Sequence, residues 1–145
     1  MRFRALLILV TILCASALPL RAADDIVIIV SPDNRVTKIA DTDLKMIYLG
    51  EKKQWEDGRA IITVDLEENN SIRERFVNIF LSRSVASLKY YWIQQIFTGR
   101  GVPPLELKNE RQIIEYVASH PGSIGYIEAH NLDSSVNRVS VTGSR

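Results

Sequence analysis

The chain has 145 residues, with 18 Lys and Arg against 17 Asp and Glu, and its formal net charge is +1. This length predicts about one domain, and a hydrophobic content of 46% is enough for a packed core. The sequence has no stripe of Lys and Arg interleaved with aromatic residues. A nucleic-acid-binding function is therefore not expected.

The first 23 residues have the organisation of a cleavable signal peptide. Arg2 and Arg4 give a positively charged start, and an almost unbroken apolar run follows over residues 5–17. Small residues then lie around Ala23, where a signal peptidase would cut. Because the apolar run is shorter than a bilayer-spanning helix requires, we expect a periplasmic product with no membrane span after cleavage.

Cleavage after Ala23 would leave residues 24–145 as one domain. Loss of the segment lowers the basic residues from 18 to 15, against 17 acidic residues, and removes Cys14, the single Cys of the chain. A disulfide, a thiol nucleophile and a Cys-based metal site are thereby excluded. A lipoprotein would use Cys14 as its anchor, but lipidation favours a small residue before the Cys, and Leu13 lies there. We therefore expect a lipid-free protein.

Four short runs of β-branched and apolar residues, each bounded by turn residues, predict strands. They lie at residues 25–30, 60–64, 123–127 and 136–141. The first run is apolar without alternation, which is typical of a strand covered on both faces. Apolar residues at helical spacing predict helices that begin near Asp41, Ser71, Ser84 and Asn109. This alternation predicts an α/β fold class, with a mainly parallel sheet covered by helices.

Two features of the predicted helices concern capping and packing. Ser71 and Glu74 have the spacing of a capping box, which predicts Ser71 as the N-cap of its helix. Leu88, Trp92 and Ile96 form an apolar stripe at helical spacing. We interpret this stripe as part of the core.

Four segments, in chain order, resemble the periplasmic phosphate-binding proteins of bacterial ABC importers. They are Ser31-Pro32-Asp33-Asn34, residues 43–50, Trp55-Glu56-Asp57-Gly58 and residues 121–126. Together they span nearly the whole chain after the signal peptide. The resemblance implies a single type II periplasmic-binding-protein lobe, the second of the two lobes that family members close over their ligand. It also implies phosphate or a similar oxyanion as ligand and an ABC importer as partner.

The phosphate-binding proteins that the chain resembles carry a ligand signature in this lobe: an Arg, three further residues, and then Ser-Gly-Thr at the start of a helix. Alignment on Phe76 puts Leu66 at the Arg position and residues 70–72 at Ser-Gly-Thr. The start of a helix favours an anion because its first backbone N–H groups have no partner within the helix and because it is the positive end of the helix dipole. The turn at residues 69–73 is therefore the natural anion site, and Arg73, in the first turn of the same helix, could replace the missing cation although it does not match the motif. The candidate residues are Asn69, Asn70, Ser71, Ile72 and Arg73.

The same turn has a second interpretation, as an ordinary helix cap. Ser71 and Glu74 would then satisfy the free N–H groups, and Glu67 and Glu68 would repel an incoming anion. Two functions therefore stay open. One is non-catalytic binding of an oxyanion for an ABC importer. The other is a single-lobe adaptor that contacts another periplasmic or envelope protein and has lost its ligand.

Catalytic and metal-dependent functions have little support in the sequence. After cleavage there is no Cys, and the chain has no Gly-x-Ser-x-Gly motif and no Gly-rich nucleotide loop, so we expect neither an enzyme nor a cofactor. His120 and His130 lack the spacing and the neighbouring ligands of a metal site. Trp55 could stack on a ligand, but we interpret it as core packing between a helix and a strand.

Overall fold

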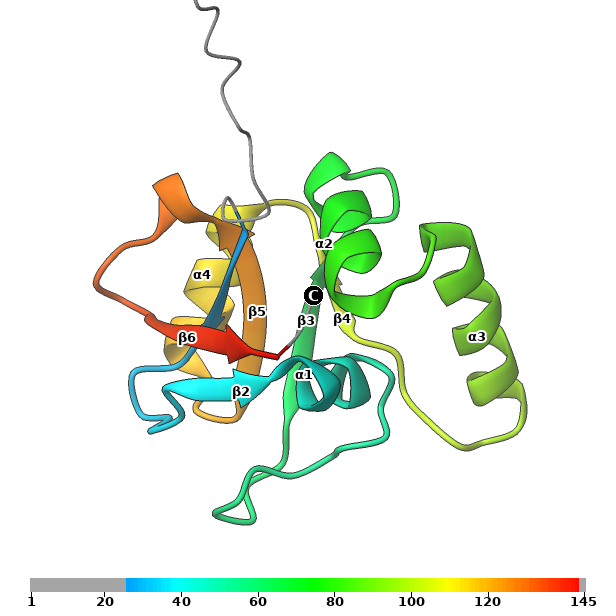
Figure 1. Ribbon diagram of the computed structural model, residues 1–145, viewed down its shortest axis with the longest axis horizontal. Coiled ribbons are helices and arrows are strands. Elements are labelled where there is room, and N and C mark those ends of the chain that lie inside the picture. Colours follow the sequence, from blue (N-terminus) through cyan, green and yellow to red (C-terminus); the bar gives the residue numbers. More distant parts are fainter. Residues whose placement is uncertain (1–25, 144–145) are drawn as a thin grey trace, which may run out of the picture.

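The computed structural model describes residues 26–143 (Figure 1), so the predicted signal peptide lies outside the described residues. The strands are β1 Ile26–Val30, β2 Lys38–Ala40, β3 Ile62–Leu66, β4 Leu105–Leu107, β5 Ser123–Glu128 and β6 Asn137–Thr142. The α-helices are α1 Asp41–Tyr48, α2 Ser71–Leu81, α3 Val85–Phe97 and α4 Glu110–Ser119, and a short 3-10 helix follows β5 at Ala129–Asn131. Within residues 26–143, every helix is too short or too polar to span a lipid bilayer.

The six strands form one sheet in the order β2-β6-β1-β5-β3-β4. β1 lies inside the sheet and runs antiparallel to both of its neighbours, β6 and β5. The β2–β6, β3–β5 and β3–β4 pairs are parallel. The α/β fold class is confirmed, and the sheet is mixed because β1 reverses direction. The continuous apolar pattern of β1 fits its place, since an inner strand is buried on both faces whichever way it runs.

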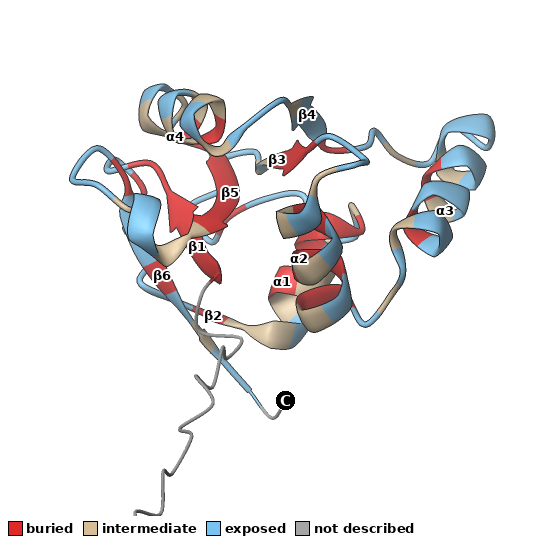
Figure 2. Cartoon of the chain, turned by 90° about the horizontal axis from the view of Figure 1, so that it is seen from above, coloured by how far each residue is buried: buried red, intermediate tan, exposed pale blue. Residues whose placement is uncertain are grey.

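Helices cover both faces of the sheet, as Figure 1 and Figure 2 show. α4 packs on one face against β5, β3 and β1, and α1 and α2 lie on the other face. α4 approaches β5 closely at Gly125, where an added Cβ would lie 2.8 Å from Ile113 Cγ2. A glycine is therefore needed at this position, because a side chain would push the helix away from the strand.

Polar side chains cap the starts of three helices. Ser84 caps α3 and Asn109 caps α4 through hydrogen bonds from backbone N–H groups of the first turn, which confirms both predicted starts. The prediction that Ser71 caps α2 is wrong. Asn70 caps this helix instead, because its Oδ1 accepts from Ile72 N at 2.8 Å, and Ser71 is the first helical residue.

The sequence pattern does not predict β2 or β4. Each strand has three residues and lies at one edge of the sheet, where partial burial leaves no clear apolar alternation. β3 begins at Ile62, two residues later than predicted. The reason is that Gln54 and Ala60 form an isolated bridge that closes the preceding turn.

α3 lies at the side of the molecule, away from the sheet (Figure 1 and Figure 2). Its inner face is anchored by Leu88 and Trp92, which are buried as predicted. The Trp92 ring packs against Gly50, where an added Cβ would lie 3.0 Å from the ring and where a φ of +70° favours glycine. The prediction that Ile96 belongs to the core is wrong, because 56% of this residue is exposed.

Candidate functional site

The predicted anion residues lie together where the turn after β3 leads into the first turn of α2. Asn69 and Ser71 are exposed, and Asn70 uses its side-chain oxygen to cap the helix. The N–H group of Ile72 therefore already donates to a protein acceptor. One of the donors that an anion would need at this helix start is thus occupied.

Arg73 points back from the first turn of α2 towards β3. Its Nη1 atom donates a hydrogen bond to the Leu66 carbonyl oxygen at 2.9 Å. The guanidinium group therefore lies beside the residue that aligns with the Arg of the resembling family. Only 7% of Arg73 is exposed, so a ligand would meet little of its surface.

Two carboxylates compensate the charge of Arg73. Asp65 Oδ2 lies 3.2 Å from Nε of Arg73, and Glu106 Oε1 lies 2.6 Å from Nη1. Asp65 and Glu106 are direct partners in the β3–β4 ladder, where like charges repel each other. Arg73 removes this repulsion by lying against both. The cation therefore serves as the counter-ion of carboxylates in its own chain.

Aromatic residues enclose the Asp65 carboxylate. The Tyr126 hydroxyl donates to Asp65 Oδ1, and Phe76 stacks on the Tyr126 ring with centroids 3.8 Å apart. Tyr48 packs edge-on to Phe76 and donates to the Val64 carbonyl oxygen at 3.1 Å. The carboxyl end of β3 is therefore packed and hydrogen-bonded.

Burial and charge pairing act in opposite directions at this cluster. Burial raises the pKa of the Asp65 carboxyl, and the nearby Arg73 guanidinium offsets this effect only in part. Burial alone would lower the pKa of the Arg73 guanidinium. The negative charges of Asp65 and Glu106 outweigh the effect of burial, so this pKa is raised. Arg73 therefore stays charged, with Nη1 hydrogen-bonded to Glu106 and to the Leu66 carbonyl oxygen and Nε in an ion pair with Asp65.

The surface hollow beside the predicted anion residues has an acidic lining. It has a volume of about 460 Å³ and lies between the starts of α2 and α3. Glu68 and Glu74 bring carboxylates to it, and the described residues that line it include no cation. Lys89, outside this lining, pairs with Glu68 at 2.9 Å. This distribution of charge disfavours a phosphate or sulfate ion.

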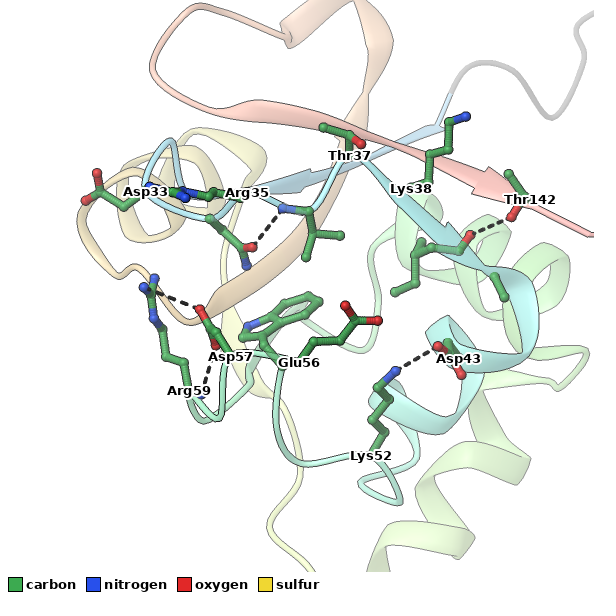
Figure 3. Close-up of a pocket in the computed structure, with 15 residues that line it drawn as sticks. Asp33, Arg35, Thr37, Lys38, Asp43, Lys52, Glu56, Asp57, Arg59 and Thr142 are labelled. Carbon is green, nitrogen blue, oxygen red and sulfur yellow. Dashed lines mark hydrogen bonds and ion pairs between the residues drawn. The ribbon is translucent and has the colours of Figure 1, made fainter.

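A larger hollow, of about 820 Å³, lies beside the loop after β1 and the turn before β3 (Figure 3). None of the predicted anion residues lines it, because it lies at the opposite end of β3. Figure 3 shows two ion pairs in its wall, Lys52 with Asp43 and Arg59 with Asp57. Trp55 also lines it but is only 6% exposed, and its Nε1 donates to a backbone carbonyl at 2.9 Å, so the prediction of core packing is confirmed.

Residues 26–143 contain no group of three or more His, Cys, Asp or Glu side chains placed to hold a metal ion. His120 stacks on Tyr116 with ring centroids 3.8 Å apart. His130 is exposed and lies 3.8 Å from the Glu128 carboxylate. Each imidazole thus contacts a side chain of its own chain, Tyr116 for His120 and Glu128 for His130.

Sequence reasoning missed Asp65 and Glu106 as the partners of Arg73. Glu106 lies 33 residues further along the chain, on a strand that the pattern does not predict. Asp65 did carry a signal in the sequence, because it lies between two apolar residues of a strand. An Asp that is buried in such a strand almost always has a charged or hydrogen-bonding partner. That signal indicates a partner without saying which residue provides it.

A model of the PBP superfamily domain matches residues 20–144, which is most of the chain. The chain belongs to the PBP superfamily. No curated protein matches it. Solved structures with the same fold as this PBP superfamily chain include phosphate receptors of ABC transporters.

Three of these structures define the extent of the likeness. An ABC-type phosphate transport receptor from Vibrio cholerae has a TM-score of 0.67 at 18% identity, over 83% of this chain and 47% of the receptor. A phosphate ABC transporter substrate-binding protein from Clostridium perfringens, solved with bound phosphate, has a TM-score of 0.67 at 23% identity, over 81% of this chain and 44% of that protein. PstS from Borrelia burgdorferi has a TM-score of 0.64 at 17% identity, over 83% of this chain and 48% of PstS. The chain spans about half the length of these structures, and the likeness shows a shared fold.

Proposed function

We propose that this domain is a non-catalytic envelope protein that acts by contacting another protein, and that it does not hold a free oxyanion at the start of α2. The observation that carries this proposal is the placement of Arg73 between Asp65 and Glu106. Phosphate would have to displace a carboxylate that is already within hydrogen-bonding distance of the guanidinium. The acidic hollow nearby adds a further electrostatic cost.

Exposed apolar residues favour a protein as the partner. Four of them lie on α3 and one lies in the loop that follows, and between 52% and 92% of each is exposed: Tyr90, Ile93, Ile96, Phe97 and Val102. Contiguous apolar patches on a protein surface mark sites of contact with other proteins. We therefore assign the proposed contact to α3.

The second candidate function is binding of phosphate or a similar oxyanion for an ABC importer. Two observations favour it: the fold shared with phosphate receptors, and the position of Arg73 beside Leu66. In this case Glu106, whose side chain is 50% exposed, would have to move away when the anion enters. The two candidates therefore differ in whether Arg73 is available to a ligand.

Thermal melts with phosphate and with sulfate, at tens of millimolar and against chloride of matched ionic strength, separate the two candidates. Saturation at about 100 times the dissociation constant would stabilise a binding protein by about 2.7 kcal/mol, a shift of several degrees. We expect no shift beyond the chloride control. A shift that Arg73→Ala abolishes and Arg100→Ala keeps would overturn the protein-contact proposal, because Arg100 is exposed and does not line the hollow beside the predicted anion residues.

The proposed location is the periplasm, reached through the signal peptide of residues 1–23. The proposed partner there is another envelope protein, and a component of an ABC importer is the alternative that follows from the second candidate function. Contact with either partner requires export of the chain.

A further inference from the structure

The outer face of α3 carries an apolar stripe with heptad spacing. Ala86, Tyr90, Ile93 and Phe97 follow one another at intervals of 4, 3 and 4 residues, and we call these four residues the α3 stripe. Such intervals are those of residues that face a second helix in a coiled coil. The exposed fractions are 72% for Tyr90, 52% for Ile93 and 92% for Phe97. The α3 stripe therefore faces solvent in the described chain.

α3 is apolar on its opposite face as well. Leu88 and Trp92 on that face are buried against the rest of the domain. A helix with apolar residues on both sides is typical of the interior of a larger assembly, whereas a surface helix normally has one polar side. Figure 2 shows α3 at the margin of the molecule, where a second molecule can reach it.

The α3 stripe carries no charge. The one charged residue of α3 is Lys89, and it pairs with Glu68 of the same chain. A helix that lies on a membrane surface would carry several Lys or Arg on its polar side, whereas α3 has a single Lys and that Lys is paired with Glu68. A two-fold interface, in contrast, places the same surface on both sides, so a neutral surface avoids repulsion between like charges.

We propose that two copies of this chain pair through antiparallel contact of their α3 stripes, about a two-fold axis perpendicular to the helices. The stripe keeps its spacing when its direction is reversed, because the intervals read the same from either end. Ala86 then lies opposite Phe97 of the second copy, and Tyr90 lies opposite Ile93. A small side chain thus meets a large one at each end of the contact, which is the pattern of close packing between helices.

The exposed area is sufficient for such a pair. Taking about 150 to 250 Å² as the scale of a whole large apolar side chain, the exposed parts of Tyr90, Ile93 and Phe97 in the stripe, together with Ile96 beside it, amount to on the order of 500 Å² per copy. Two copies would then bury on the order of 1,000 Å², which reaches the lower limit for a specific interface. This inference rests on the proposed protein-contact function and names a second copy as the partner.

Sedimentation equilibrium of the exported protein, from about 1 to about 500 µM, tests the pairing in the concentration range of weak dimers. We expect the mass to rise from that of one chain to that of two. Phe97→Glu should weaken the association at least tenfold, because it places two carboxylates in an apolar contact. Met46→Glu is the matched control, since Met46 is 40% exposed on α1 and lies outside the α3 stripe.

Cross-linking tests the antiparallel register, because the chain has no Cys after residue 14. A mixture of Ala86→Cys and Phe97→Cys should form a disulfide-linked pair under copper-catalysed air oxidation, faster than either variant alone. A single-chain mass at every concentration, or equal weakening by Met46→Glu and Phe97→Glu, would refute the pairing. Neither result depends on phosphate binding, so the protein-contact function stands or falls by the melts described above.

Discussion

Arg73 lies between two carboxylates that differ in their access to water. The Asp65 side chain is 2% exposed and sits under the Tyr126 hydroxyl, whereas the Glu106 side chain is 50% exposed. Asp65 therefore depends on Arg73 much more than Glu106 does, because a buried charge without a partner has lost its hydration. In the proposed function, the same arrangement that pairs β3 with β4 would occupy Arg73 and leave it unavailable as a ligand-binding cation.

The variant Arg73→Leu should lower the free energy of unfolding by about 3 to 5 kcal/mol, because it leaves Asp65 buried without its cation. Urea denaturation measures this loss. Arg75→Leu is the matched control on the same helix: Arg75 pairs with Glu128 at the surface, with side chains 40% and 25% exposed, and its loss should cost about 1 kcal/mol or less. Equal losses in the two variants would contradict the buried ion pair.

At the scale of elements, prediction succeeds where the local pattern is strong. The unbroken apolar run of β1 and the Ser84 and Asn109 caps each mark their element within a few residues. β2 and β4 have three residues each, too few for a period to show, and only pairing with β6 and β3 makes them strands. The α2 start was ambiguous because Asn70 and Ser71 are adjacent and both residue types cap helices well.

The cap of α2 gives a prediction at this scale. Asn70→Ala should lower the free energy of unfolding by about 1 kcal/mol, because Ile72 N loses the acceptor that lies 2.8 Å away. Ser71→Ala, one residue further on and exposed, should change it by less than about 0.5 kcal/mol. Denaturant melts of the two variants decide between the caps, and a larger effect at Ser71 would restore the capping box that the sequence suggested.

At the scale of the whole molecule, the predicted site depended on contacts that a local pattern does not contain. Residues 69–73 are neighbours in the chain, so their meeting at the start of α2 needed no tertiary information. Tertiary information was needed, in contrast, to tell whether Arg73 is free to contact a ligand. Only the register that pairs Asp65 with Glu106 across β3 and β4 shows that the cation is already matched.

Export is the prediction that concerns residues 1–23. The exported protein should begin near Ala23 or Asp24 and carry no lipid, because the small residues around Ala23 suit cleavage by a signal peptidase. Intact-mass spectrometry of the periplasmic fraction measures the start directly. A mass that corresponds to a lipid-modified Cys14 at the N-terminus would show that the protein is anchored instead.

The two tryptophans lie in different parts of the domain and in different surroundings. Trp55 Nε1 donates to the Gly122 carbonyl oxygen at 2.9 Å beside the larger hollow, whereas Trp92 Nε1 is buried under α3 with no hydrogen-bond partner among residues 26–143. Indole fluorescence responds to local polarity and hydrogen bonding, so the domain carries two separable intrinsic probes. In Trp55→Phe the remaining emission would report the seating of Trp92 against Gly50, and hence any displacement of α3 as concentration rises, without an added label.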